Sequence, residues 1–302
     1  MLNGIVLRSR GGIYEVETDE GVREAVLRGR VKREERVGDR VIVGDRVAIR
    51  LDPASDAWTI ESVAERESAL VRRAPGKAPR AKAIVANIDR VVIVFAVASP
   101  APHLRMLDRF LVLCESSGVD ALIVANKVDL TTEPAALAIF DEYERIGYPV
   151  IRTSTSTGEG VAQLRKILCE GISALTGPSG VGKSSLLNEV QPGLGLRVGK
   201  VSEHVQKGRH TTVTAELIHL ECGGYVADTP GLRELGLWGI DARELDLYFP
   251  EFEPFLGQCR YRNSCTHSHE PECAIRQAVE DGAVSATRYD SYLRLLRGDE
   301  DA

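Results

Sequence analysis

The stretch "GPSGVGKSS", Gly177 to Ser185, decides the fold of this chain. It matches the pattern GxxxxGK[ST], in which a glycine-rich loop joins a strand to a helix and wraps phosphate groups in backbone N–H groups. The apolar run "GISALT" directly before it predicts the strand that such a loop needs. The stretch therefore predicts a P-loop, in which Lys183 neutralises phosphate charge and the Ser184 hydroxyl ligates Mg²⁺.

Every residue of this loop is a candidate nucleotide contact. We expect the phosphates to be bound by Gly177, Pro178, Ser179, Gly180, Val181, Gly182, Lys183, Ser184 and Ser185. Lys183 is also a candidate catalytic residue, since phosphoryl transfer depends on stabilising the charge of the transferred group.

The segments around the loop alternate between strands and helices from residue 83 to residue 235. The runs "IDRVVIVFAVA", "VDALIVAN", "YPVIRTS" and "GISALTG" are continuously apolar, which is typical of strands buried on both faces. Helices are predicted for His103–Ser117, Pro134–Ile146 and Val161–Cys169, and "TAELIHLE" with "GGYVADT" predicts a hairpin. The pattern indicates a doubly wound α/β domain.

A second motif, "VANKVDL", has the form NKxD and directly follows an apolar strand. The Asp129 carboxylate can accept from both N1–H and the exocyclic amine of guanine, which adenine does not offer. Asn126, Lys127 and Asp129 therefore form a candidate base-reading site that selects GTP over ATP. A plain strand-to-helix turn would also explain the tetrapeptide, but the P-loop in the same domain favours the nucleotide site.

Two further stretches would complete a Mg²⁺ site. In "ADTPG", Asp228 is expected to hold Mg²⁺ through water, and the Gly231 N–H to meet the γ-phosphate. "GRHTTVT" lies between the P-loop helix and this motif, where a switch segment is expected. Thr211 and Thr212 are the candidate nucleotide and Mg²⁺ contacts there, and Thr212 is also a candidate catalytic residue.

The order of these motifs along the chain is unusual. "TSTSTGEG", at 153–160, follows the base reader and could close over the base through Ser154 and Thr155, although an ordinary loop has the same composition. The order is base reader, base clamp, P-loop, switch and DTPG, which is the usual G-protein order cut after DTPG and rejoined. Such a circular permutation preserves the site, because the termini of a compact domain lie at its surface.

After residue 236 the chain carries a cysteine and histidine cluster. "CRYRNSCTHSHEPEC" supplies Cys259, Cys265, His267 and Cys273, a set that suits one tetrahedral, structural Zn²⁺, with His269 as an alternative ligand. Helices are predicted for Ala274–Asp281 and Ala286–Arg297. The remaining cysteines stand singly in apolar surroundings and are predicted to be inert buried thiols; they are Cys114, Cys169 and Cys222.

The first 67 residues contain five short candidate strands separated by turn residues, which suits a small β-barrel of the OB-fold type. Such barrels bind single-stranded nucleic acid or protein, and the sequence leaves both open. Residues 68–82 form a basic linker that could contact a phosphate backbone or be a plain solvated connector. We therefore expect a multidomain chain, with a barrel (1–67), this linker, a permuted GTPase domain (83–235) and a helical zinc-binding domain (236–302).

Composition limits the class of protein. The 302 residues are 43% hydrophobic and 27% charged, with a net charge of −6, as in a globular protein and unlike a general nucleic-acid binder. The longest apolar run, "VVIVFAVA", is far shorter than the ~20 residues of a membrane span. We expect a cytoplasmic monomer without a membrane partner.

Taken together, NKVD, GPSGVGKSS, GRHTT and DTPG, between an N-terminal barrel and a Cys/His segment, resemble the bacterial ribosome small subunit-dependent GTPases of the RsgA (YjeQ) type. The resemblance implies a GTPase that binds the small ribosomal subunit and its rRNA late in maturation and is stimulated by it. His210 matches the family position proposed to assist water attack, although a loop histidine that contacts RNA would also explain it. Leu232 stands where many GTPases have glutamine, so slow intrinsic hydrolysis is expected. Five residues separate Cys259 from Cys265, where the family usually has four.

Two other functions fit parts of the pattern. A P-loop ATPase or kinase would make NKVD accidental and would bind ATP as well as GTP. A scaffold that binds RNA or the ribosome could retain a nucleotide pocket without activity, but decay would first strike Lys183, Ser184 and Asp228, which are intact.

Overall fold

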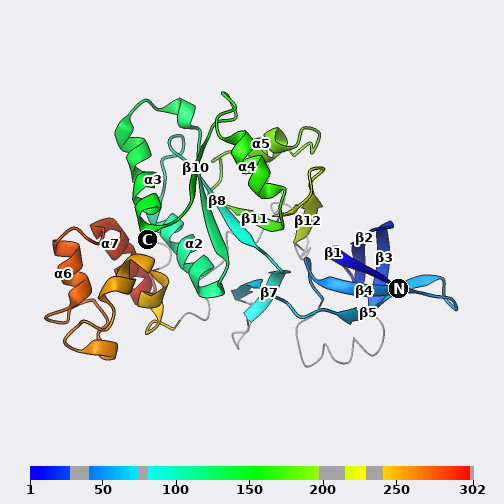
Figure 1. Cartoon of the computed structure of the whole chain (residues 1–302), viewed down its shortest axis with the longest axis horizontal. Coiled ribbons are helices and arrows are strands. Elements are labelled where there is room, and N and C mark those ends of the chain that lie inside the picture. The colour runs from blue at the N-terminus through cyan, green and yellow to red at the C-terminus, as the bar shows by residue number, and fades with distance from the viewer. Residues whose placement is uncertain (28–40, 74–80, 197–214, 229–240, 300–302) are drawn as a thin grey trace, which may run out of the picture.

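The computed structural model describes residues 1–27, 41–73, 81–196, 215–228 and 241–299. The chain runs from a β-barrel at one end, through a central α/β domain, to a small helical domain at the other end (Figure 1). Of the helices in these described ranges, none combines the length and the apolar character needed to cross a membrane.

The N-terminal part is the predicted five-stranded barrel. Strands pair in the order β1-β2-β3-β5-β4, and β4 also pairs with β1, which closes the barrel. Along β2, Tyr14 and Val16 point into the barrel core while Glu15 and Glu17 alternate with them. The strands are β1 (Leu2–Arg10), β2 (Ile13–Thr18), β3 (Gly21–Leu27), β4 (Arg46–Asp52) and β5 (Ala57–Val63).

The segment predicted as a basic linker contains secondary structure. Strands β6 (Ala69–Arg73) and β7 (Ala81–Ala86) form an antiparallel ribbon between the barrel and the α/β domain. Leu70 and Val85 on this ribbon are buried in the main hydrophobic core. The sequence did not indicate these strands, because only a few apolar positions of the ribbon face the core and basic residues stand between them.

The central domain is the predicted doubly wound sheet. Its strand order is β10-β9-β8-β11-β13-β12, and all neighbours are parallel except β12 and β13. The strands are β8 (Arg90–Ala96), β9 (Asp120–Asn126), β10 (Val150–Thr153), β11 (Ile172–Thr176), β12 (Glu216–His219) and β13 (Tyr225–Asp228). The helices are α2 (Leu104–Ser117), α3 (Pro134–Ile146), α4 (Val161–Leu168) and α5 (Lys183–Val190), with a short 3₁₀ turn, η1 (Val128–Leu130).

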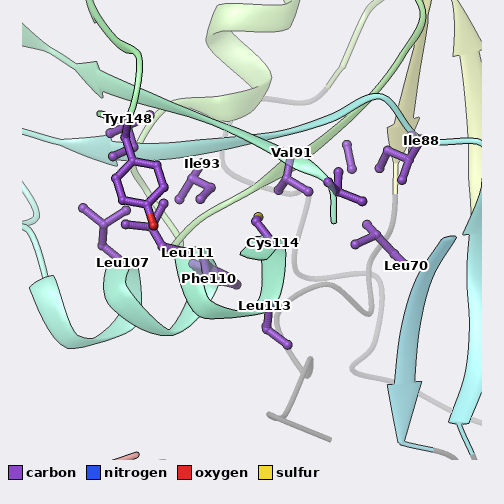
Figure 2. Packing of buried hydrophobic residues seen from close by; sticks show 14 of the residues in the cluster. Leu70, Ile88, Val91, Ile93, Leu107, Phe110, Leu111, Leu113, Cys114 and Tyr148 are labelled. Atoms are coloured by element: carbon purple, nitrogen blue, oxygen red, sulfur yellow. The ribbon is translucent and has the colours of Figure 1, made fainter. Parts of the chain in front are cut away.

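Strand β8 shows why the apolar runs are continuous. Val91 and Ile93 belong to the core that α2 and α3 cover, whereas Val92 and Val94 belong to the core that α4 and α5 cover. Figure 2 shows Val91 and Ile93 facing the side chains of α2, among them Leu111. Both faces of the strand are therefore buried, as the sequence predicts.

The barrel and the α/β domain share one sheet. Strand β1 pairs antiparallel with β12, with Arg8 opposite Glu216, and the two side chains form an ion pair. On β2, Glu17 accepts a hydrogen bond from the Tyr225 hydroxyl at 2.8 Å and lies 2.8 Å from His219 Nδ1. The barrel thus contacts the β12–β13 hairpin through backbone and side chains.

The C-terminal domain is mainly helical, as predicted. It packs on α2 and has its own core around Phe249, Phe252 and Tyr292. Its elements are the 3₁₀ helices η3 (Leu245–Tyr248), η4 (Pro250–Phe255) and η5 (Arg262–Ser264) and the helices α6 (Ala274–Glu280) and α7 (Ala286–Arg297). Ser285 caps α7 by accepting from the backbone of residues 287 and 288, and Gly298 ends it in the left-handed conformation.

A buried ion-pair network joins this domain to α2. Arg288 is 1% exposed and donates to Asp108 Oδ1 at 2.8 Å and to Glu251 Oε1 at 2.7 Å. The Tyr143 hydroxyl, on α3, and Ser291 also donate to Asp108. Burial opposes the charge of Arg288, but the two carboxylates raise its pKa well above the usual value.

Replacing Arg288 with methionine is expected to lower the free energy of unfolding by about 3 kcal/mol, because both carboxylates would remain buried without their cation. The measurement is denaturant unfolding followed by circular dichroism. Adding Asp108→Asn and Glu251→Gln should recover part of this loss, because the two buried carboxylates that Arg288 neutralised are then replaced by neutral amides. Arg294→Met, which breaks a half-exposed pair with Asp290, is the control and should cost less than about 1 kcal/mol. Equal losses for Arg288→Met and Arg294→Met would contradict the assignment.

Candidate functional site

The P-loop connects β11 to α5, as the sequence predicts. Gly177 and Gly182 have φ values of 132° and 100°, in the left-handed region. A Cβ atom on Gly177 would lie 2.0 Å from the Val94 carbonyl oxygen, and one on Gly182 would lie 2.4 Å from Asn126 Nδ2. Glycine is therefore required at both positions by backbone conformation and by close approach. Lys183 donates to the carbonyl oxygens of Gly177 and Pro178 at 2.7 and 2.6 Å.

The NKVD residues touch the P-loop directly. Asn126, at the end of β9, donates through Nδ2 to the Val181 carbonyl oxygen at 2.8 Å, across 55 residues of sequence. Lys127 donates to the Gly180 carbonyl oxygen at 2.7 Å and also contacts the carbonyl of Ser99. The predicted base-reading motif and the predicted phosphate-binding motif thus form one hydrogen-bonded unit at the carboxyl edge of the sheet, where open α/β sheets bind ligands.

The loop after β10 is bonded to the base reader. The Ser154 hydroxyl donates to Asp129 Oδ1 at 2.6 Å, and it accepts from the backbone N–H groups of Ser156 and Thr157. Thr155 is half-buried beside it. Thr153, which the sequence analysis did not identify, donates to Asn126 Oδ1 at 2.9 Å and fixes the orientation of that amide. The predicted base clamp and base reader are therefore adjacent.

The Mg²⁺ side of the predicted site is described in part. Ser184 is buried at the start of α5. Asp228 ends β13, which is the parallel neighbour of β11, so its backbone lies at the same sheet edge as the P-loop. The Asp228 side chain and four predicted site residues, His210, Thr211, Thr212 and Gly231, lie outside the residues that the structure describes.

Two cavities differ in their relation to these motifs. A cavity of about 30 Å³ lies beside Lys183 and Ser184, with Ile218 and Val226 in its lining. A cavity of about 750 Å³ lies among the amino ends of β8 and β9, with Arg90, Asp120 and Tyr148 in its lining. Of the motif residues that the structure describes, none lines the larger cavity, so volume alone does not identify the nucleotide site.

The predicted metal ligands converge in the C-terminal domain. Cys259, Cys265, His267 and Cys273 are buried, and one ligand atom from each lies within 4.8 Å of the others. His267 Nδ1 is 3.4 Å from the sulfur of Cys259 and 3.4 Å from that of Cys273. Three thiols and one imidazole nitrogen are a donor set that fits Zn²⁺. The residues present therefore fit a metal ion of this type.

Groups around the cluster orient its ligands. Asp246 Oδ2 lies 3.1 Å from His267 Nε2, which leaves Nδ1 to face the cysteines. Burial alone would lower the pKa of His267, but its hydrogen bond to Asp246 and the nearby Cys259 raise it. The Ala274 N–H donates to the Cys259 sulfur at 3.3 Å. Such carboxylate–histidine pairs are typical of metal sites.

The spacing of the first two cysteines is accommodated by a turn. The 3₁₀ helix η5 lies between Cys259 and Cys265 and brings both into the cluster. His269, the alternative ligand, is exposed and bonds to the Ser268 hydroxyl. Cys259 and His267 therefore lie in the cluster, and the exposed His269 is not among its four residues.

One prediction about cysteines is wrong. Cys114 is a buried free thiol, as predicted, and burial raises its pKa. Cys169 and Cys222, however, form a disulfide across 53 residues. Each cysteine stands three residues before a strand, which the sequence could show. The structure adds that these two strands, β11 and β13, are parallel neighbours. Strand adjacency is not visible in sequence, so the pair was missed.

The chain is similar to known proteins in both its N-terminal and its central domain. Residues 63–238 match the RsgA GTPase family and residues 3–59 match the RsgA N-terminal domain. The chain is 50% identical to a small ribosomal subunit biogenesis GTPase RsgA of Gemmatimonas aurantiaca over 97% of this chain and 95% of the relative. It is 44% identical to the protein of the same name from Moorella thermoacetica, over 98% and 96%.

Two solved structures match over nearly the full length. The crystal structure of YjeQ from Thermotoga maritima has a TM-score of 0.79 at 36% identity and covers 98% of both chains. The structure of YloQ, described as a circularly permuted GTPase, has a TM-score of 0.76 at 30% identity and covers 100% of this chain and 96% of its own. With its permuted motif order, its five-stranded barrel and its Cys₃His cluster, the chain belongs to the RsgA GTPase family.

Proposed function

We propose that this protein binds GTP with Mg²⁺, hydrolyses it to GDP and phosphate, and acts in the late maturation of the small ribosomal subunit. The observation that carries the proposal is the direct hydrogen bonding of Asn126 and Lys127 to the P-loop. It supports a single pocket that holds a guanine base at one end and phosphates at the other.

The residues take separate roles in this pocket. Asp129 receives the guanine N–H groups, with Ser154 holding its carboxylate. Lys183 exchanges its two loop carbonyl oxygens for phosphate oxygens when nucleotide binds. Ser184, Thr212 and Asp228 would hold Mg²⁺, which neutralises charge that develops on the phosphates.

The partner is the small ribosomal subunit and its rRNA. Support comes from the relatives, which are named small ribosomal subunit biogenesis GTPases and match this chain over nearly its whole length. Binding of the subunit raises the hydrolysis rate, the protein acts as a monomer in the cytoplasm, and one structural zinc per chain sits at the Cys₃His cluster. Four protein ligands fill a tetrahedral ion, so this zinc has no open position for chemistry.

The test is to measure GTP and ATP turnover with and without purified small subunits. We expect slow GTP turnover alone, strong stimulation by the subunit, and little ATP turnover in either case. Lys183→Ala is the matched control and should abolish the stimulated rate while the chain stays folded. Equal use of ATP, or GTP turnover that the subunit leaves unchanged, would refute the proposal.

His210 is proposed to assist the attack of water on the γ-phosphate. Replacing it with alanine should lower subunit-stimulated turnover by about a hundredfold, the usual scale for a general acid or base, and leave GTP affinity nearly unchanged. Single-turnover hydrolysis and equilibrium nucleotide binding measure the two effects separately. His269→Ala, which removes an exposed imidazole from the C-terminal domain, serves as the control. An unaltered rate in the His210 variant would retire this role.

A further inference from the structure

A disulfide bond joins the turn of the β12–β13 hairpin to the residue that follows α4. Cys222 lies in the turn between the two strands and is exposed, whereas Cys169 directly follows α4 and is half-buried. Their Cα atoms are 5.4 Å apart and their sulfur atoms are bonded. A disulfide with an exposed cysteine is open to attack by small thiols, which distinguishes it from a buried structural crosslink.

The position of the bond relates it to the nucleotide site. Strands β11 and β13 are paired in register, with Ile172 opposite Tyr225, and each cysteine precedes its strand by the same three residues. The bond therefore ties together the amino ends of two strands. The carboxyl ends of the same strands carry the P-loop and Asp228. The disulfide thus crosslinks the two strands that hold the predicted phosphate-binding and Mg²⁺-binding residues.

Non-covalent contacts hold the two cysteines in place without the bond. The Tyr225 N–H donates to the Gly171 carbonyl oxygen at 2.8 Å, and the Glu221 N–H donates to Gln191 at 2.8 Å. A Cβ atom on Gly224 would lie 2.3 Å from the Leu168 carbonyl oxygen, so the turn lies directly against the end of α4. The thiols of the reduced protein would remain within bonding range, because this backbone separation is typical of disulfides.

We propose that Cys169 and Cys222 are a reversible redox site that controls the mobility of the β12–β13 hairpin. Along the chain, β12 follows the "GRHTTVT" stretch and β13 ends at Asp228, so the hairpin connects two motifs of the site. When oxidised, the bond holds the hairpin to the P-loop strand. When reduced, the turn is held by non-covalent contacts alone and opens more often.

The oxidant is a small-molecule disulfide such as glutathione disulfide. The exposed Cys222 thiolate attacks one of its sulfur atoms, which forms a mixed disulfide and releases one glutathione thiolate. Cys169 thiolate then attacks the Cys222 sulfur and displaces the second glutathione thiolate. Two electrons pass from the protein thiols to the glutathione disulfide bond, and the two protons that the protein thiols lose end on the released glutathiones. Reduction is the reverse sequence.

The first experiment equilibrates the native full-length protein, in the presence of zinc, with glutathione buffers of varied ratio. Differential alkylation and peptide mass spectrometry then give the oxidised fraction of Cys169 and Cys222. We expect this fraction to change fully and reversibly across the series while the Cys114 peptide stays unmodified. A bond that resists millimolar reductant in the native protein, or one that never forms, would overturn the proposal.

The second experiment measures hydrogen exchange of the backbone amides from residue 216 to residue 226. We expect exchange about tenfold faster in the reduced protein than in the oxidised protein, with little change in α2. The double variant Cys169→Ser, Cys222→Ser should exchange at the reduced rate in both buffers. Equal exchange in the two redox states of the wild-type chain would show that the bond does not control the hairpin. Neither experiment depends on ribosome binding, so the outcome is independent of the proposed function.

Discussion

Cys265→Ser is expected to unfold much of the C-terminal domain and to reduce the zinc content from about one ion per chain to almost none. A structural zinc ion contributes roughly 10 kcal/mol or more to folding at neutral pH, which is comparable to the whole stability of a small domain. The domain is small, and three of its buried core residues are cluster cysteines. Without the ion, the three buried thiols would lose the partner that their sulfur atoms share, and His267 would keep only its contact with Asp246 outside the cluster.

Elemental analysis measures the zinc, and hydrogen exchange of α6 and α7 measures the unfolding. Nucleotide affinity should remain close to that of the wild type, because the nucleotide site lies in the α/β domain. His269→Ala is the matched control: its imidazole is two residues from His267 but exposed, and zinc content should not change. A Cys265→Ser chain that keeps α6 and α7 protected would show that the metal does not hold this domain together.

Asp129→Asn is expected to lower GTP affinity by about a thousandfold. The substitution removes the charge that accepts two guanine N–H groups, and each charged hydrogen bond is worth roughly 1.5–3 kcal/mol. It also places an amide donor against the donors of the base. Xanthosine triphosphate carries a carbonyl where guanine carries its exocyclic amine, so the introduced side-chain amide could pair with it. The variant should therefore bind xanthosine triphosphate more tightly than GTP.

Competition binding with the two nucleotides measures this reversal. Asp141→Asn is the control, because Asp141 is a half-exposed carboxylate that pairs with Arg152 on the outside of the same domain. Its variant should bind GTP as the wild type does. If Asp129→Asn binds both nucleotides as the wild type does, Asp129 does not read the base.

The elements that the sequence predicted are those determined by local pattern. The apolar runs and the helices from His103 to Cys169 were located to within a few residues, since each carries a strong period and clear ends. The P-loop and NKVD were also visible, because their chemistry requires a fixed set of neighbouring residue types. Whether Asp129 and Lys183 act on one nucleotide is still a prediction.

Features that depend on contacts between distant segments were missed. Thr153, which bonds to Asn126, begins the TSTSTGEG stretch, but the sequence did not single it out from its neighbours. Asp246, which lies beside His267, belongs to no sequence motif. The Cys169–Cys222 bond needed knowledge that β11 and β13 are neighbours. The β6–β7 ribbon has few apolar positions and is stabilised by packing on other segments. In each case the deciding interaction is tertiary, and a single sequence does not display it.

The pairing of β1 with β12 has a mechanical consequence. A module attached by a flexible tether can rotate freely and passes little force to its neighbour. Here the barrel is joined to the α/β domain by the backbone hydrogen bonds of a common sheet and by the Glu17 contacts to the hairpin. A torque exerted on the barrel by a large bound particle would be passed through these contacts to the β12–β13 hairpin, whose second strand ends at Asp228.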